Sequence, residues 1–285
     1  MSRNMRLYYY GILGAMGGLV GGRIFDAIGF GRRAVYLSDA LLGAALGLAM
    51  GLFIGLAEMI LSRSVVRGLR AGLIGGVIGL IVGAITLPLA EFIFQAVGAG
   101  IPGRALGWGI FGGLLGIANS IGVRTQMWKG IVGGFIGGLI GGALLEFVFG
   151  QFDNPLLGKF VGLMMLGAAI GLFTALIVAT LSRAWIEVKT GKLKGTEFIL
   201  DKFVGDGAPA AIIGSNVLKS DIALPDPLIS PQHARLKGGG AAMTLTDMSM
   251  DGTYVNGRKV ETVNLADNAL IRLGKTELVY HEKRV

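Results

Sequence analysis

The sequence predicts a multi-domain protein in which an all-α polytopic membrane domain precedes an all-β sandwich. From Leu7 to Leu181 the chain is mostly Leu, Ile, Val, Ala and Gly, and its apolar runs reach the roughly 20 residues that cross a bilayer. After Arg183 the pattern changes to short alternating segments separated by turn residues, which is typical of strands. We therefore predict domains at residues 1–183 and 184–285.

The composition argues against several classes of function. The chain has no cysteine, which excludes disulfides, thiolate zinc sites and cysteine nucleophiles. Its net charge is +8, but many basic residues lie in short loops between apolar runs, as orientation in a membrane requires. We predict no nucleic-acid partner, no metal and no cofactor. Residues 1–6 show no cleavage site after a short apolar core, so we expect no cleaved signal peptide.

Six apolar runs are expected to be transmembrane helices, because a backbone in lipid must satisfy its own hydrogen bonds. The alternating polarity of an outer-membrane barrel does not occur in them. The chain has 50 glycines, and many recur inside these runs, where small residues let helix backbones approach closely as a glycine zipper. The expected spans are 7–29, 40–61, 72–97, 105–122, 131–149 and 160–181.

The spans repeat with a period of about 60 residues. The sequence LGAALG at residues 42–47 recurs as LGAAIG at residues 166–171, and a looser copy begins at Leu106. Three helical hairpins in tandem, all with the same orientation, explain this pattern. The alternative is that glycine-rich and leucine-rich helices resemble one another by composition alone.

Six crossings place both termini on one side, and the side with more basic loop residues is expected to be cytoplasmic. We therefore predict a multi-pass protein of the plasma or inner membrane whose termini and C-terminal domain are cytoplasmic. The basic residues on that side are Arg3, Arg6, Arg63, Arg67, Arg70, Arg124, Lys129, Arg183 and Lys189, against Arg32, Arg33, Arg104 and Lys159 opposite.

Four acidic residues fall in or near the apolar helices, where an ionisable group is costly. At a rise of about 1.5 Å per residue, Glu91 and Glu146 approach the far interface. Two interpretations stay open: interfacial acids paired with Arg104 or Lys159, or a pathway for cations or protons. Pro88 is expected to kink its helix. The candidate intramembrane site comprises Asp26, Glu58, Glu91 and Glu146.

The C-terminal domain is predicted to be a β-sandwich. Residues 185–188 and 197–200 flank a Gly-Lys-Leu-Lys-Gly turn and predict a β-hairpin. Further strands are expected at 211–213, 221–224, 234–237, 243–247, 253–255, 269–273 and 276–281.

Separated blocks of this domain resemble, in order, the forkhead-associated (FHA) domain. The blocks are Ile213-Gly214, Asp221-Ile222, Ser230-x-x-His233-Ala234-x-Leu236, Leu245-x-Asp247 and Gly252-Thr253-x-Val255-Asn256-Gly257. The resemblance covers only about 185–280. It implies an eleven-stranded SMAD/FHA-like β-sandwich whose loops at one end hold a phosphothreonine peptide, without catalysis.

The resemblance also implies a set of site residues, two of which depart from the family. Ser215 stands where the family has arginine, and Asp251 stands where it has asparagine. Losing a guanidinium and gaining a carboxylate both oppose phosphate binding. The implied phosphopeptide-binding residues are Ser215, Ser230, Pro231, Gln232, Arg235, Asp251, Gly252 and Thr253, supported structurally by Gly214, His233 and Asn256.

Two interpretations of the site therefore stay open. One is phosphothreonine recognition, with positive charge from another basic residue; the other is an FHA fold that binds unphosphorylated protein or assembles with itself. The residues that could compensate are Lys219, Arg235, Lys237 and Arg258.

We predict no enzyme. His233 lies near Ser230 in sequence, but the resemblance makes this histidine structural, and Ser230-Pro231 is no nucleophile elbow. His281 is expected to lie near the C-terminus without a specific role, and Arg258-Lys259 to form a solvated turn.

The sequence thus predicts a membrane-tethered FHA-domain adaptor for protein–protein recognition in signalling. Its expected partners are proteins, threonine-phosphorylated ones among them, the lipid bilayer and further copies of itself. The alternative is a transporter, channel or secretion-complex subunit that its FHA-like domain regulates. The short connection from Arg183 to Lys194 suggests that the sandwich senses the state of the helices.

Overall fold

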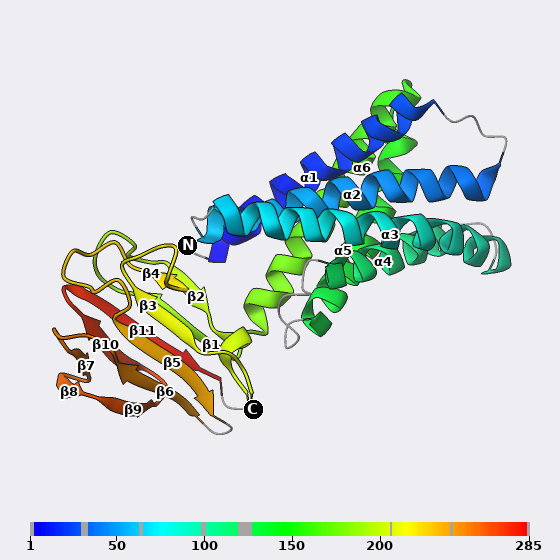
Figure 1. The fold of residues 1–285 in the computed structure, drawn as a ribbon. Coiled ribbons are helices and arrows are strands. Elements are labelled where there is room, and N and C mark those ends of the chain that lie inside the picture. Colours follow the sequence, from blue (N-terminus) through cyan, green and yellow to red (C-terminus); the bar gives the residue numbers. More distant parts are fainter. Residues whose placement is uncertain are drawn as a thin grey trace. The chain divides into compact units, whose positions relative to one another are not determined.

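The computed structural model of the protein describes residues 3–29, 34–62, 65–97, 101–118, 127–205, 207–239 and 242–283. The chain divides into a helical unit, Asn4–Thr180, and a β unit that begins at Leu181 (Figure 1). Three residues separate the last helix, which ends at Thr180, from the first strand, which begins at Ala184.

The described residues of the helical unit form six helices, as the sequence predicts. Five of them are long and apolar enough to cross a membrane, and the exception is α4. Helix α3 continues through Pro88. The predicted fourth span extends to residue 122, and residues 119–122 lie outside the described part. The helices are α1 (Arg3–Ile28), α2 (Val35–Ser62), α3 (Val65–Val97), α4 (Ile101–Ala118), α5 (Met127–Phe149) and α6 (Pro155–Thr180).

Glycines bring three pairs of antiparallel helices into backbone contact. In each contact, a Cβ atom added at one or both of the glycines would lie under 3.0 Å from a backbone atom of the partner helix, closer than side chains normally approach. Between α2 and α3, and between α4 and α5, successive contacts advance by one turn in opposite directions along the two helices. They are Gly43 with Gly83, Gly47 with Gly79 and Gly51 with Gly75 between α2 and α3; Gly112 with Gly134 and Gly116 with Gly130 between α4 and α5; and Gly14 with Gly167 between α1 and α6.

These pairs join successive hairpins of the predicted triplication, and the pair of α6 with α1 closes the series. Within the first hairpin, Gly17 of α1 packs against Met50 of α2, and within the third, Gly137 of α5 packs against Ile170 of α6. The buried apolar cluster of this unit comes mainly from the even-numbered helices: Leu46, Met50, Ile54, Leu87, Phe111, Leu115, Leu163, Leu166 and Ile170.

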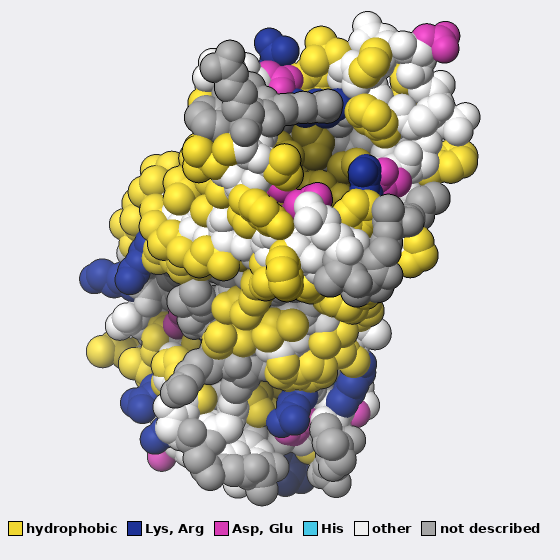
Figure 2. Space-filling view, turned by 90° about the vertical axis from the view of Figure 1, so that its right-hand side faces the viewer, with side chains coloured by type: hydrophobic (Ala, Val, Ile, Leu, Met, Phe, Trp, Pro, Cys, Tyr) yellow, Lys and Arg dark blue, Asp and Glu magenta, His cyan; other side chains and the backbone are white. Residues whose placement is uncertain are grey.

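Large apolar side chains of the helical unit point outward. On α3, Val77, Ile81 and Ile85 follow one another by one turn and are all more than half exposed. Figure 2 shows wide hydrophobic areas with few charged side chains among them. Soluble monomers rarely expose continuous apolar surfaces of this kind, whereas a helix bundle in lipid presents such a surface and packs its small residues inside.

The β unit has eleven strands within the described residues, in two sheets. One sheet has the order β2-β1-β11-β10-β7-β8, and the other β4-β3-β5-β6-β9. Their inward side chains form one core that includes Ile186, Ile213, Leu236 and Tyr280. The strands are β1 (Ala184–Val188), β2 (Glu197–Ile199), β3 (Ala211–Gly214), β4 (Ile222–Ala223), β5 (Ala234–Gly239), β6 (Ala242–Asp247), β7 (Thr253–Val255), β8 (Arg258–Val260), β9 (Thr262–Leu265), β10 (Ala269–Leu273) and β11 (Thr276–Glu282).

Two local predictions were wrong. Arg258 and Lys259 do not form a turn but begin β8, because the turn falls on Asn256 and Gly257, whose φ angles of 50° and 80° suit a tight hairpin. Lys129, expected in a loop, lies in the first turn of α5 and is 2% exposed. His281 lies in β11, as predicted, and the strand extends one residue further, to Glu282, because it pairs with β1 along its length.

Candidate functional site

Three loops meet at one end of the sandwich: residues 215–221, 224–233 and 248–252. The Ser215 amide donates to the Ser230 carbonyl at 3.0 Å, which brings the first two loops together. The Ser220 hydroxyl donates to the Pro231 carbonyl at 2.8 Å, which joins the same loops a second time. Of the predicted binding residues, Ser215 and Ser230 are therefore neighbours.

Gly214 makes this approach possible. The Ser220 hydroxyl oxygen would lie 2.7 Å from a Cβ added at Gly214, and the Pro231 carbonyl would lie closer still. Any larger residue would push the second loop away from the first. The supporting role that the resemblance gives Gly214 thus has a steric cause.

His233 links the second loop to the third. Its ring is fully buried, and its Nδ1 accepts a hydrogen bond from the Ser230 amide at 3.1 Å. In the neutral ring the proton is then on Nε2, which lies 3.1 Å from the Ser249 hydroxyl oxygen and 3.4 Å from the Gly252 carbonyl oxygen. The histidine is a brace between loops.

This tautomer also argues against a hydrolytic role. The Ser249 hydroxyl donates to the Asp247 carboxylate at 2.9 Å and faces a ring nitrogen that already carries a proton. Nδ1 is occupied by the Ser230 amide. His233 is therefore not arranged to remove a proton from either serine.

Asp247 fixes the third loop. Its Oδ1 accepts hydrogen bonds from the Ser249 hydroxyl and from the Thr253 hydroxyl, the latter at 2.8 Å. Burial raises the pKa of the Asp247 carboxyl, but the hydrogen bonds from Thr253 and Ser249 outweigh burial and hold the pKa below its ordinary value of 3.8. The loop is thus organised around a carboxylate that stays ionised.

Asp226 anchors the second loop to the turn between β10 and β11. Its carboxylate accepts hydrogen bonds from the Leu228 amide, the Lys275 amide and the Thr276 hydroxyl. Burial raises the pKa of the Asp226 carboxyl, but these hydrogen bonds lower it by more, so the pKa lies below its ordinary value of 3.8. Asn256 braces a neighbouring turn, because its side-chain oxygen accepts from the Leu270 amide at 2.9 Å.

The other predicted binding residues divide into exposed and inward-facing groups. Pro231, Gln232 and Asp251 are exposed on the second and third loops. Thr253 is fully buried, and its hydroxyl donates a hydrogen bond to Asp247. Arg235 pairs with Ile212 and Thr246 within its sheet, so it belongs to the sheet's outer face rather than to the loops.

Lys259 is a neighbour of the site that the sequence did not indicate. It pairs with Tyr254 across β7 and β8, and a Cβ atom added at Gly252 would lie 2.8 Å from its Nζ. Gly252 has a φ of 87°, so glycine is favoured there by backbone conformation as well as by room for the lysine. The contact of Lys259 with Gly252 depends on the register of the β7–β8 hairpin, so it could not be read from the sequence.

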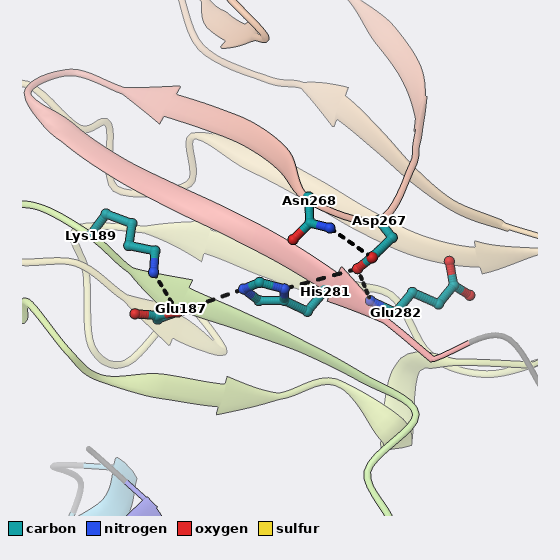
Figure 3. Close-up of polar contacts among 6 residues, drawn as sticks. All are labelled: Glu187, Lys189, Asp267, Asn268, His281 and Glu282. Carbon is teal, nitrogen blue, oxygen red and sulfur yellow. Dashed lines mark hydrogen bonds and ion pairs between the residues drawn. The ribbon is translucent and has the colours of Figure 1, made fainter.

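A second polar cluster lies on the six-stranded sheet around His281 (Figure 3). The imidazole stacks on Trp185 and lies between two carboxylates, 3.6 Å from Glu187 and 3.9 Å from Asp267. Asp267 also accepts a hydrogen bond from the Glu282 amide at 2.9 Å. The expectation that His281 has no specific role was wrong, since it connects β1, β11 and the turn before β10.

The acidic residues of the helical unit make separate contacts. Glu146 accepts two hydrogen bonds from Arg104, at 2.9 and 3.0 Å, and Asp26 forms an ion pair with Lys159. Glu91 accepts a hydrogen bond from Gln95 at 2.9 Å. The side chain of Glu58 lies outside the described part of the structure. Glu146 and Asp26 thus have the basic partners, Arg104 and Lys159, that the first interpretation expects.

The β unit is thus a two-sheet sandwich with three loops braced together at one end. A family model of the FHA domain matches residues 211–274. Residues 211–274 are thus an FHA domain, which covers only a segment of the chain.

Curated proteins are similar to about a third of this chain. The glycogen accumulation regulator GarA of Mycolicibacterium smegmatis is 34% identical over 98 residues, which span 34% of this chain and 58% of that protein. The oxoglutarate dehydrogenase inhibitor of Corynebacterium diphtheriae is 31% identical over 96 residues, which span 33% of this chain and 62% of that protein. In both, this chain matches less than two thirds of the relative's length.

Solved FHA domains are also similar. The FHA domain of the CT664 protein from Chlamydia trachomatis is 31% identical, with a TM-score of 0.33, and the match covers 36% of this chain and 100% of that chain. The FhaA FHA domain, solved in complex with the intracellular domain of Rv3910, is 28% identical, with a TM-score of 0.30, over 34% of this chain and 99% of that chain.

Proposed function

We propose that this protein is a membrane-anchored adaptor whose FHA domain binds a partner protein in a phosphothreonine-dependent manner. The observation that carries the proposal is the loop arrangement, in which Gly214, His233 and Asp247 hold Ser215 and Ser230 together at the mouth of the site. FHA domains recognise phosphothreonine peptides, and the solved FhaA complex is an FHA domain bound to another protein.

Exposed apolar side chains beside the site favour a protein partner. Leu218 on the first loop is 79% exposed, and Met250 on the third loop is 100% exposed. Apolar contacts at the centre of an interface supply much of its binding free energy. The related regulator and inhibitor proteins bear names that fit control of another protein, which is the role we propose here.

Membrane anchoring is supported by the five long apolar helices and by their outward Val, Ile and Leu side chains. We assign the FHA domain to the cytoplasmic face, where kinases and ATP are present. Because the chain has no native cysteine, single cysteines at Thr190 and at Asn154 can report the two sides by labelling with a membrane-impermeant maleimide. Labelling of Thr190→Cys in intact cells would contradict the cytoplasmic assignment.

Adaptor function is favoured over transport by the interior of the helical unit. Its buried cluster consists of large apolar side chains from α2, α3, α4 and α6. A polar pathway would need to pass through or around this cluster.

Phosphate dependence is tested with the full chain in lipid nanodiscs and two immobilised peptide libraries, one with phosphothreonine and one with threonine at the fixed position. We expect clear retention on the phosphothreonine library and little on its threonine counterpart. Equal retention on both would reduce the role to phosphate-independent protein binding.

A further inference from the structure

The site lacks an arginine after Gly214, so a phosphate there needs positive charge from another part of the domain. A phosphothreonine carries nearly two negative charges at neutral pH, and Asp251 adds another carboxylate nearby. The described basic side chains differ in which part of the domain they face, which narrows the choice.

Most basic side chains near the site are directed elsewhere. Arg235 and Lys237 alternate with buried residues along β5, so both lie on the outer face of the five-stranded sheet. The Nζ atom of Lys202 lies 3.7 Å from a carboxylate oxygen of Asp221, so this lysine already has an acidic partner. Successive residues of a strand point to opposite faces, so Arg258 on β8 points away from the face that carries Lys259. Lys275 lies close to Asp226, and its charge helps to lower the pKa of that carboxyl. Lys219, on the first loop, and Lys259 remain.

Lys259 has the geometry that the site requires. The end of its side chain lies next to Gly252, because a Cβ atom added at Gly252 would be 2.8 Å from Nζ. The ammonium group is therefore beside the loop that carries Asp251. Within the described residues, no carboxylate lies within ion-pair distance of Lys259. Its charge is therefore available to a ligand.

Arg272 strengthens the positive potential next to this position. It pairs with Tyr254 in the sheet, as Lys259 does from the other side, and its guanidinium lies 4.4 Å from the centre of the Tyr254 ring. In register, the row across four strands is Glu277, Arg272, Tyr254 and Lys259, and Lys259 is the member beside Gly252. Its two cations outnumber its one carboxylate, so the row favours the approach of an anion.

We infer that Lys259 supplies the cation that binds the phosphate group, in place of an arginine at position 215. This inference rests on the proposed phosphothreonine recognition. The ammonium group would reach the phosphate from the β8 side, across Gly252, while Ser230 contacts it from the second loop. Lys259 also offsets the negative charge of Asp251, which otherwise opposes phosphate.

The test compares full-chain variants in nanodiscs on the phosphothreonine and threonine libraries. Lys259→Gln is expected to weaken retention on the phosphothreonine library by about tenfold or more, as loss of a charged hydrogen bond does, and to leave retention on threonine peptides unchanged. Lys259→Arg should retain the preference. Lys237→Gln, with the same charge change on the other sheet, is the matched control, and Lys219→Gln tests the competing residue.

The outcomes separate the inference from the proposed function. If the natural chain shows no preference for phosphothreonine, both fail. If it shows the preference and Lys259→Gln keeps it, only the inference fails, whichever way Lys219→Gln behaves. A second variant checks the result: adding Ser215→Arg to Lys259→Gln should restore the preference, because it returns a cation to the same phosphate from the opposite loop.

Discussion

The Nε2 atom of His233 lies 3.1 Å from the Ser249 hydroxyl oxygen, and this contact holds the second and third loops of the FHA domain together. His233→Ala would leave the Ser230 amide and the Gly252 carbonyl without their buried partner. We expect a loss of about 1–3 kcal/mol in the free energy of unfolding and weaker phosphopeptide binding. Calorimetry of the full chain measures the first effect. The exposed Gln232→Ala is the control, and equal stability of the two variants would contradict the bracing role.

Acid should destabilise the β unit through Asp247. Its pKa in the folded state lies below 3.8, so its stabilising effect is present above about pH 4 and is lost as the pH falls through the folded pKa. Asp247→Asn should therefore lower stability at pH 7 and flatten the decline below pH 4. Thermal unfolding from pH 7 to pH 3 checks this, with Asp251→Asn, an exposed aspartate of the same loop, as the control. An unchanged acid profile in Asp247→Asn would show that other carboxylates cause the decline.

Helix packing gives a matched pair of glycine variants one turn apart on α1. At Gly14 a Cβ atom would collide with the Gly167 carbonyl, whereas at Gly11 the nearest atom is Leu172 Cβ at 3.8 Å. Gly14→Ala should cost about 1–3 kcal/mol through overpacking. Gly11→Ala should be neutral, or up to about 1 kcal/mol more stable because alanine favours helix. Heating in detergent followed by size-exclusion chromatography compares them, and equal losses would contradict the pairing of α1 with α6.

The helix pairs also predict a stabilising charge change. In two pairs, an ion pair lies beyond the glycine contacts: Arg104 is one turn before Trp108, which meets Gly138, and Glu146 is two turns after Gly138. Likewise, Lys159 is one turn before Leu163, which meets Gly18, and Asp26 is two turns after Gly18.

In the third pair, α2 with α3, Gly43 meets Gly83. The residue one turn before Gly43 is Asp39 and the residue two turns after Gly83 is Glu91, and both are acidic. Asp39→Lys should therefore complete the set and raise stability by about 1 kcal/mol, the scale of a partly exposed ion pair. Asp39→Asn, which removes only the like charge, should give a smaller gain. A lower melting temperature for Asp39→Lys than for the natural chain would contradict the equivalence of the three pairs.

The sequence was sufficient for the elements whose patterns are local. Long apolar runs predicted six helices, alternating residues predicted most strands, and blocks around Gly214 and His233 predicted the FHA domain. The helix partners were not predictable, because glycines occur on two faces of α1 and α5 and composition does not say which face meets which helix.

Other features depend on contacts distant in sequence. Strand β8 is short and mostly exposed, so it lacks the alternating apolar residues that would have indicated it. The position of Lys259 over Gly252 and that of His281 between two carboxylates follow from strand register. Neither has a sequence motif of its own.

The most direct test of phosphothreonine recognition is hydrogen–deuterium exchange of the full chain in nanodiscs, with a phosphothreonine peptide selected from the library and with its threonine form. We predict that the phosphorylated peptide alone slows exchange in the three loops, at residues 215–221, 224–233 and 248–252. The same protection by both peptides, or protection confined to other parts of the chain, would contradict this account.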